Sequence, residues 1–362
     1  MQIINKFLRL QKLYIFFISF LLFIIIFSTS YLHANNFKVT DIEISSSFDL
    51  NFNKNRVIDE GFRDSFSNLL SMITTSGDKD KIKRISLKEL KRLIDSFTIS
   101  EERFINNEYF AKLDTTFNKK KTLSFLEKKN IFPSTPIKNK VLLIPILVDV
   151  ETDKIYLFTN NIFYKKWNND KKNYHLLEYL LPSEDLEDMN AIQNTSNLIE
   201  NYDFTNLISK YDLQDYIISI IFNNKTEVKV LSKINLNNSL KINNKKFSKI
   251  NINSEKDFQK IRESLKTIYE NYWKKNNEIN TSIKLPLTIS ISAQRYKKIL
   301  ELESALNSMD LVSNFYISRF DNQNIYFKII YNGSPKIFLN DFNKRNINLL
   351  TKNEVWSVKW KV

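Results

Sequence analysis

Carboxylates crowd into one short stretch of this chain, and they are its clearest candidates for chemistry: Glu184, Asp185, Glu187 and Asp188. Paired carboxylates can bind calcium or act as a general acid and base. Acidic residues are also common where a helix begins, and Pro182 followed by Ser183 as the cap predicts such a start. The spacing does not match a calcium-binding EF-hand loop. The sequence therefore favours a helix start, with Asp185 and Asp188 kept as the site of an alternative hydrolase.

Composition excludes most other catalytic or cofactor-binding motifs. His175 is the one histidine after His33, so a triad or a zinc site would depend on it. A single histidine outside a motif is more often a packed or surface residue. The chain has no cysteine, hence no thiolate zinc site and no disulfide. Its three glycines are too few for a loop that cradles phosphate. We therefore predict no catalytic residue, no cofactor and no metal site.

The N-terminal segment, residues 1–34, predicts where the protein works. An apolar run from Leu13 to Phe27 follows three basic residues, which is the pattern of a signal peptide or a membrane anchor whose basic flank stays in the cytoplasm. The apolar run has the length of the hydrophobic region of a signal peptide. If residues 28–32 are included, it reaches the ~20 residues that a membrane-spanning helix needs. Cleavage is slightly favoured, and both fates stay open. The rest of the chain is predicted in the periplasm, exported through or anchored in the inner membrane.

The positive charge of the chain is large but spread out. The formal net charge is +14, and the basic residues lie along a sequence rich in Lys, Asn, Ile and Phe. This distribution is typical of compositional drift rather than of one nucleic-acid-binding patch. Nucleic acid is therefore not expected as a partner. The apolar and aromatic contents, 43% and 13%, predict folded cores rather than disorder.

Periodicity divides the exported part into three folded units of α+β and α/β type. Residues 36–135 predict a small α+β domain in the order β-α-α-β-β-α. Residues 140–250 predict an α/β middle domain around the apolar strand 141–148, in which Pro145 indicates a bulge or a strand end. Residues 284–362 follow the order β-α-β-β-α-β of a ferredoxin-like domain.

Residues 251–283 predict a basic amphipathic helix that connects the last two units, with Ser254 in a capping-box position. Such a helix could bind an anionic lipid surface or nucleic acid through residues 254–279. Basic side chains on one face more often form a solvated surface, and this is the favoured interpretation for four of them: Lys256, Lys260, Arg262 and Lys266. Trp167 and Trp356 are expected in cores, because their apolar neighbours share their periodicity.

The order of features along the exported part resembles a family of bacterial envelope proteins catalogued as domain of unknown function 2066. The similarity rests on short motifs in colinear order: Phe37-x-Val39, Tyr109-x-Ala-x-Leu113, Leu142-Leu-Ile-Pro145, Trp167, Pro182-x-x-Asp185-Leu-x-Asp188, Tyr211, Trp273, Tyr331-x-Gly333 and Trp356. The resemblance implies an exported or membrane-associated protein without an established activity. It marks Asp185, Asp188, Trp167, Tyr211, Gly333 and Trp356 as possible binding or motif positions.

The sequence thus predicts a periplasmic, non-catalytic binding or scaffold protein in envelope assembly or maintenance, with envelope proteins as partners. The inner membrane is a further partner if the leader is uncleaved. The alternatives are a periplasmic hydrolase that uses Asp185 and Asp188, and a lipid or nucleic-acid binder that uses residues 254–279. A hydrolase requires the carboxylates of Asp185 and Asp188 to line a cleft, with both at about hydrogen-bonding distance from a common point. A binding protein requires an exposed apolar patch or an open sheet edge.

Overall fold

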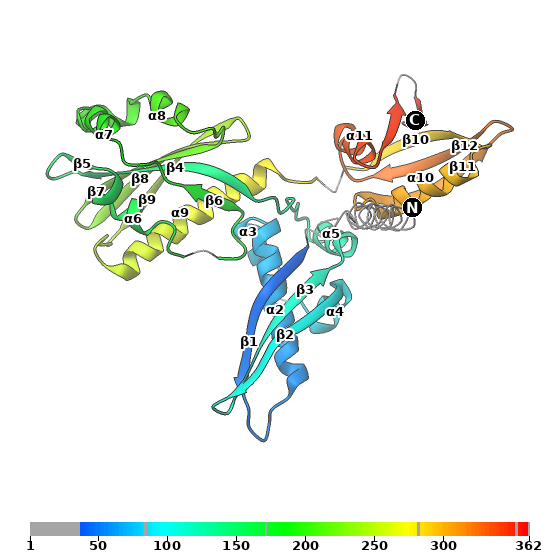
Figure 1. Ribbon diagram of the computed structural model, residues 1–362, viewed down its shortest axis with the longest axis horizontal. Coiled ribbons are helices and arrows are strands. Elements are labelled where there is room, and N and C mark those ends of the chain that lie inside the picture. Colours follow the sequence, from blue (N-terminus) through cyan, green and yellow to red (C-terminus); the bar gives the residue numbers. More distant parts are fainter. Residues whose placement is uncertain (1–36, 83–84, 171, 281–282, 352–353, 361–362) are drawn as a thin grey trace, which may run out of the picture. The chain divides into compact units, whose positions relative to one another are not determined.

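The computed structural model describes residues 37–362, except 83–84, 171, 281–282, 352–353 and 361–362. The predicted leader, with its apolar run from Leu13 to Phe27, lies outside the described residues. Across the part of the chain that is described, no helix is both long and apolar enough to cross a membrane. The described residues form a mixed α+β protein with three β-sheets (Figure 1), which confirms the predicted mixture of helices and strands.

The first sheet has the strand order β1-β3-β2, and all its strands are antiparallel. Its apolar face packs against helix α2, whose buried residues recur at three- and four-residue spacing. The elements in chain order are β1 (Lys38–Ser47), α2 (Lys54–Ile73), α3 (Ser76–Asp80), α4 (Leu87–Leu93), β2 (Ile94–Ile105), β3 (Glu108–Phe117) and α5 (Lys119–Glu127).

Local sequence signals explain the turns of this unit. Asn106 and Asn107 both have positive φ, 52° and 59°, which suits the two-residue turn that joins β2 to β3. Ser86 caps α4 by accepting a hydrogen bond from the N–H of Glu89, as expected for a capping box. A glycine is a common helix stop, which predicts that Gly77 ends the first long helix. The structure corrects this, because α2 already ends at Ile73 and Gly77 lies inside α3.

Gly61 is required by close packing between α2 and the sheet. A Cβ atom at this position would lie 2.7 Å from Ile44 Cγ2 and 2.8 Å from Leu113 Cδ2. We expect Gly61→Ala to lower the free energy of unfolding by about 1–3 kcal/mol, because the steric conflict outweighs the gain in helix propensity. Gly77→Ala is the matched control, since nothing lies within 4 Å of its Cβ position. Chemical denaturation measures both, and equal stability of the two variants would contradict this packing argument.

The second sheet has the order β5-β4-β7-β8-β9, with β6 paired to β4 beside β5. Strand β4 runs parallel to both β6 and β7 and is buried on both faces, as predicted. Its elements are β4 (Asn139–Asp149), β5 (Lys154–Tyr156), the 3₁₀ turn Phe158–Asn160, α6 (Ile162–Lys166), β6 (Leu177–Leu180), α7 (Leu186–Gln193), the 3₁₀ turn Ser196–Asn201, α8 (Thr205–Ser209), β7 (Tyr216–Asn224), β8 (Glu227–Leu236), β9 (Ser239–Ser248) and α9 (Glu255–Asn276).

Pro145 lies inside β4 without a bulge or a strand end, so that prediction is wrong. The register of β4 against β7 is continuous through Pro145. Leu142 donates its N–H toward β7 and Asn139 donates toward β6, so alternate residues face opposite sides of β4. The backbone groups of Pro145 point to the side of β4 that faces away from β7. On that side β6 pairs with residues 139–142 and β5 pairs with residues 147–149, so Pro145 lies in the unpaired gap between them. Its missing N–H therefore breaks no ladder bond, and its carbonyl accepts a hydrogen bond from Asn161 Nδ2 at 3.0 Å.

Helix α9 is part of the core of the second sheet rather than a connecting segment. Phe258, Leu265 and Tyr269 are fully buried in a cluster with residues of β4, β7 and β8. The assignment of 251–283 to a separate connecting helix is therefore corrected. Ser254 is the N-cap residue, but its side chain makes no capping hydrogen bond. Strand β9, which the sequence analysis missed, extends the sheet beyond β8.

The third sheet has the order β11-β12-β10-β14-β13. If the chain crossed from β12 through α11 directly into the last strand, that strand would run parallel to β12. It would then be antiparallel to β10, because β12 and β10 are antiparallel. The additional strand β13 forms a hairpin with β14, so β14 runs parallel to β10 and the predicted β-α-β-β-α-β unit gains a strand. Its elements are β10 (Leu285–Ser292), α10 (Tyr296–Ser308), β11 (Val312–Phe320), β12 (Asn324–Tyr331), α11 (Pro335–Asn343), β13 (Ile347–Leu350) and β14 (Val355–Trp360).

Candidate functional site

The acidic turn is a helix cap joined to an ion pair. Asp185, not Ser183, caps α7, and its Oδ1 accepts hydrogen bonds from the N–H groups of Glu187 and Asp188 at 2.8 and 3.2 Å. Lys210 Nζ donates to Asp185 Oδ2 at 2.8 Å and to Asp188 Oδ2 at 2.7 Å. The Lys210 ammonium and the capped N–H groups hold the pKa of Asp185 below its usual range. Both carboxylates therefore face a cation rather than a cleft, an arrangement that suits a structural role.

Three other motif positions have packing roles. Trp167 is completely buried beneath α9, with its ring stacked on Tyr269 at 6.1 Å. Trp356 is partly buried, and its ring lies 6.0 Å from that of Phe338. Gly333 allows close approach, because a Cβ atom there would lie 2.8 Å from Tyr331 Cε1. The contacts of these three residues are packing contacts within their own folded units.

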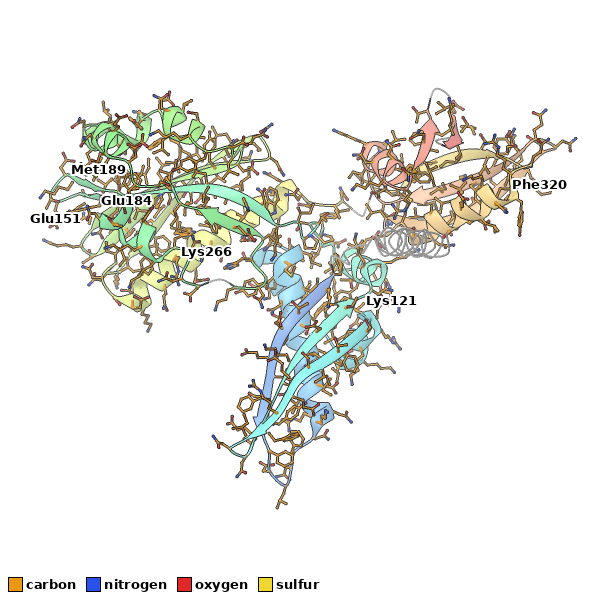
Figure 2. The ribbon with its side chains drawn as sticks, in the orientation of Figure 1. Lys121, Glu151, Glu184, Met189, Lys266 and Phe320 are labelled. Carbon is orange, nitrogen blue, oxygen red and sulfur yellow. The ribbon has the colours of Figure 1, made fainter. Side chains whose placement is uncertain are left out.

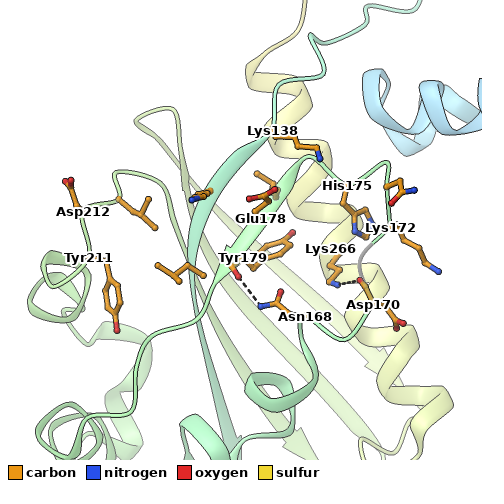
Figure 3. Close-up of a pocket in the computed structure, with 15 residues that line it drawn as sticks. Lys138, Asn168, Asp170, Lys172, His175, Glu178, Tyr179, Tyr211, Asp212 and Lys266 are labelled. Carbon is orange, nitrogen blue, oxygen red and sulfur yellow. Dashed lines mark hydrogen bonds between the residues drawn. The ribbon is translucent and has the colours of Figure 1, made fainter. Parts of the chain in front are cut away.

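Tyr211 is the motif position that reaches a pocket. A pocket of about 580 Å³ opens along β6, between the loop that precedes β7 and the loop that joins α6 to β6 (Figure 3). Tyr211 and Asp212 line one side, and Lys172, His175 and Lys266 line the other. The hydroxyl of Tyr211 accepts a hydrogen bond from Ser183 N–H at 2.6 Å.

Two side chains cover the outer edge of β6. Glu270 Oε1 accepts hydrogen bonds from the N–H groups of Leu176 and Leu177, both at 2.9 Å. Asn168 Nδ2 donates to the carbonyl of Tyr179 at 3.0 Å (Figure 3). Since an uncovered edge invites pairing with another chain, these contacts protect β6. The pocket therefore presents side chains rather than a free strand edge.

A row of buried charges on α9 forms the floor beneath the α6–β6 loop. Four charged residues repeat every fourth position and are each at most 7% exposed: Arg262, Lys266, Glu270 and Lys274. Arg262 donates to Lys166 O at 2.8 Å and also pairs with the Asp170 carboxylate. Lys266, labelled in Figure 2, donates to Asp170 O at 3.0 Å. The expectation that Arg262 and Lys266 form a solvated basic face is wrong, because the backbone of the loop lies across them.

The burial of this row is not predicted from the sequence, although the four-residue spacing of its members is visible there. Residues 262, 266, 270 and 274 continue one helix face at four-residue intervals. Charged residues at such positions are usually exposed. Only the loop that folds over them, and that offers its carbonyl and N–H groups as partners, makes their burial possible.

His175 is a partly buried neutral base at the rim of the pocket. Burial, together with the positive charges of Lys266, Lys274 and Lys172, lowers its pKa from 6.5 to about 4. The imidazole is therefore uncharged at neutral pH. It can accept or donate one hydrogen bond there but carries no charge of its own.

We expect the His175 shift to make the protein acid-sensitive. Between pH 6.5 and 4 the unfolded chain binds a proton that the folded chain does not, so stability falls as the pH falls through this window. The loss is about 2 kcal/mol once the partial exposure of the ring is allowed for. His175→Gln should remove this part of the pH dependence. The measurement is the difference in unfolding free energy between variant and wild type at pH 7.5 and pH 4. A difference that does not change with pH would contradict the prediction.

An exposed aromatic cluster lies at one end of the first sheet. The loop after β1 and the β2–β3 turn meet there (Figure 1), where Phe48 N–H donates to Asn107 O at 2.7 Å. The Phe48 and Phe104 rings lie 4.9 Å apart, and their exposed fractions are 48% and 56%. Leu50 and Ile105 beside them are also exposed. We call this set, Phe48, Leu50, Phe104 and Ile105, the aromatic tip.

The aromatic tip is built rigidly. Phe52 packs between Phe48, at 4.9 Å, and the buried ring of Tyr109, at 5.2 Å. Phe104 also contacts Tyr109 at 5.1 Å. The exposed rings are thus held by buried ones, and little conformational entropy remains to be lost when a partner binds.

Comparisons with known proteins give no family for this chain. No protein-family model matches the sequence, and no curated protein matches it significantly. The resemblance to the envelope family of unknown function therefore stays a prediction.

Proposed function

We propose that this protein is an exported, non-catalytic binding or scaffold protein of the bacterial envelope, working on the periplasmic side. The aromatic tip is the observation that carries the proposal. Soluble proteins seldom gather two phenylalanines, a leucine and an isoleucine on one projecting end unless a partner covers them. Preformed aromatic anchors of this kind dominate the energy of protein interfaces.

The partner class proposed for the aromatic tip is an envelope protein with an apolar groove. A projecting end fits a concave surface, in which Phe48 and Phe104 would be fully desolvated. Leader residues 1–34 support the location, by their basic flank and apolar run. We also take the third sheet as a variant of the ferredoxin-like arrangement, a scaffold that carries many functions and implies none.

Site-specific photocrosslinking in living cells tests this proposal. A photoreactive residue at position 104 should give one discrete protein adduct, and Phe48→Ser should abolish that adduct while the fold is kept. The control is the same residue at Lys88, an exposed position on α4, which should give no such adduct. Adducts that form equally from both positions, or only to lipid, would contradict a protein-binding tip.

The location is tested separately with a reporter fused to the C-terminus. A reporter that is active only after export should be active in this fusion, and its activity should be lost when residues 1–34 are deleted. Activity of a reporter that works only in the cytoplasm would overturn the envelope assignment and leave the binding role of the tip intact.

A further inference from the structure

The β6 pocket gathers lysines that lack carboxylate partners. Among the described residues, four lysines that line it form no ion pair within 4 Å: Lys138, Lys140, Lys172 and Lys266. Nearby lysines outside the lining are paired, Lys166 with Glu255 and Lys210 with Asp185. The Asp170 carboxylate in the lining already pairs with Arg262. Two further acidic residues, Glu178 and Asp212, line the pocket. The four lysines outnumber them, so the pocket carries an excess of positive charge.

Lys266 is the unusual member, because it is a buried cation that forms no ion pair within 4 Å among the described residues. It is 2% exposed, and its ammonium donates to one partner, the carbonyl of Asp170. Two of its three N–H donors are therefore available. Burial and the charge of Arg262 lower its pKa from 10.5 to about 8.

A second donor at the pocket also lacks a partner. The hydroxyl of Tyr179 is buried, and no hydrogen bond to it is present in the described structure. Its ring lines the pocket and points toward the side that holds His175 and Lys266 (Figure 3). Buried polar groups are seldom left without a partner, and an exception of this kind calls for a water or a ligand.

We propose that the β6 pocket binds a phosphate group, with Lys266 as its buried anchor and Lys172 and Lys138 at its rim. Lysine ammonium groups act as point charges that suit phosphate, whereas planar carboxylates are best matched by a free guanidinium fork. The guanidinium of Arg262 is already engaged with Asp170 and Lys166. This inference is independent of the aromatic tip, which lies on the first sheet.

Calorimetric titration of the full-length chain with inorganic phosphate at low salt tests the site. Lys266→Met should weaken binding by about tenfold or more, and Lys172→Gln by a few-fold, because a buried charge contact contributes more than an exposed one. The matched control is Lys260→Gln, an exposed position on α9 outside the pocket. Equal affinity of wild type and Lys266→Met would overturn the proposal. If Lys260→Gln lost as much phosphate affinity as Lys266→Met, the binding would reflect the net charge of the protein and not a specific site, which would also contradict the proposal.

The protonation states of His175 and Lys266 provide a second test, because phosphate binding should change them and a purely structural role of these residues would not. The titratable groups around Lys266 and His175 come from three places. They are Arg262, Glu263, Glu270 and Lys274 on α9, Asp170, Lys172, Tyr174 and Tyr179 on the loop and β6, and Lys79 on α3. Bound phosphate should raise the pKa of His175 from about 4 toward 6.5, as followed by its imidazole NMR signals. Affinity should fall as the pH rises above about 8, where Lys266 loses its proton. An unchanged His175 titration at saturating phosphate would place the anion elsewhere.

Two further ligands distinguish the sources of the phosphate. Glycerol 3-phosphate and a soluble short-chain phosphatidic acid carry the same phosphate monoester without and with apolar chains. Tighter binding of the lipid identifies a membrane headgroup as the ligand class, and equal binding identifies a small phosphate ester. Binding of neither, together with no binding of inorganic phosphate, would overturn the proposal.

Discussion

Glu270→Ala is expected to lower the free energy of unfolding by about 3–5 kcal/mol, the range for removing one partner from a buried charge network. The substitution leaves the N–H groups of Leu176 and Leu177 without their acceptor. It also leaves the ammonium of Lys274, 3.8 Å from Glu270 Oε2, without its buried countercharge. Burial raises the pKa of Glu270 and lowers that of Lys274, so each group depends on the other to remain charged.

Two companion variants separate the hydrogen bonds from the charge. Glu270→Gln keeps an oxygen that can accept from Leu176 and Leu177, so it should lose about 1–2 kcal/mol, less than the alanine variant. Glu263→Ala, on the same helix but partly exposed, should change stability by about 0.5 kcal/mol at most. Chemical denaturation followed by circular dichroism measures all three. If Glu270→Ala unfolds no more readily than Glu263→Ala, the network does not hold the loop.

Trp167→Ala is expected to lower the free energy of unfolding by about 3–5 kcal/mol, as for other large buried rings. The indole is 0% exposed and lies in edge contact with Tyr179 at 5.4 Å. Lys266 Nζ lies 5.9 Å above the ring, so the cavity would open beneath the β6 pocket. Loss of the ring should therefore loosen the pocket as well as the core.

A second variant, Trp167→Phe, separates the packing of the Trp167 ring from any polar contact of its indole nitrogen. Among the described residues the buried Trp167 Nε1 has no hydrogen-bond partner. Trp167→Phe therefore removes no hydrogen bond seen there and should lose only about 1–2 kcal/mol. Leu186→Ala, at a position 72% exposed, should be neutral within about 0.5 kcal/mol. Equal effects of the phenylalanine and alanine variants would indicate that the indole is held by polar contacts rather than by packing.

Much of the local structure could be predicted because it depends on neighbours in the sequence. The alternation from Tyr109 to Phe117 predicts a strand with one buried face, and β3 has that burial pattern. A phase slip in the alternation of the first strand near Asp41 predicts a bulge, and β1 has one there, with positive φ at Asp41 and a register shift between Val39 and Ile42. Pro145 was misjudged because its effect depends on which side of β4 lacks a partner strand. That information resides in the pairing of β5 and β6 and not in the residues around the proline.

By itself the sequence determined the periodic helices and strands, the apolar residues that fill the cores, and the exclusion of cysteine chemistry and glycine-rich phosphate loops. These properties follow from side-chain type and spacing along a few turns or strands. The tertiary structure alone decided that Arg262, Lys266, Glu270 and Lys274 are buried, and that Lys138, His175 and Lys266 share one pocket. The physical reason is that burial of a charge depends on partners brought by a distant loop, and periodicity along the chain carries no record of them.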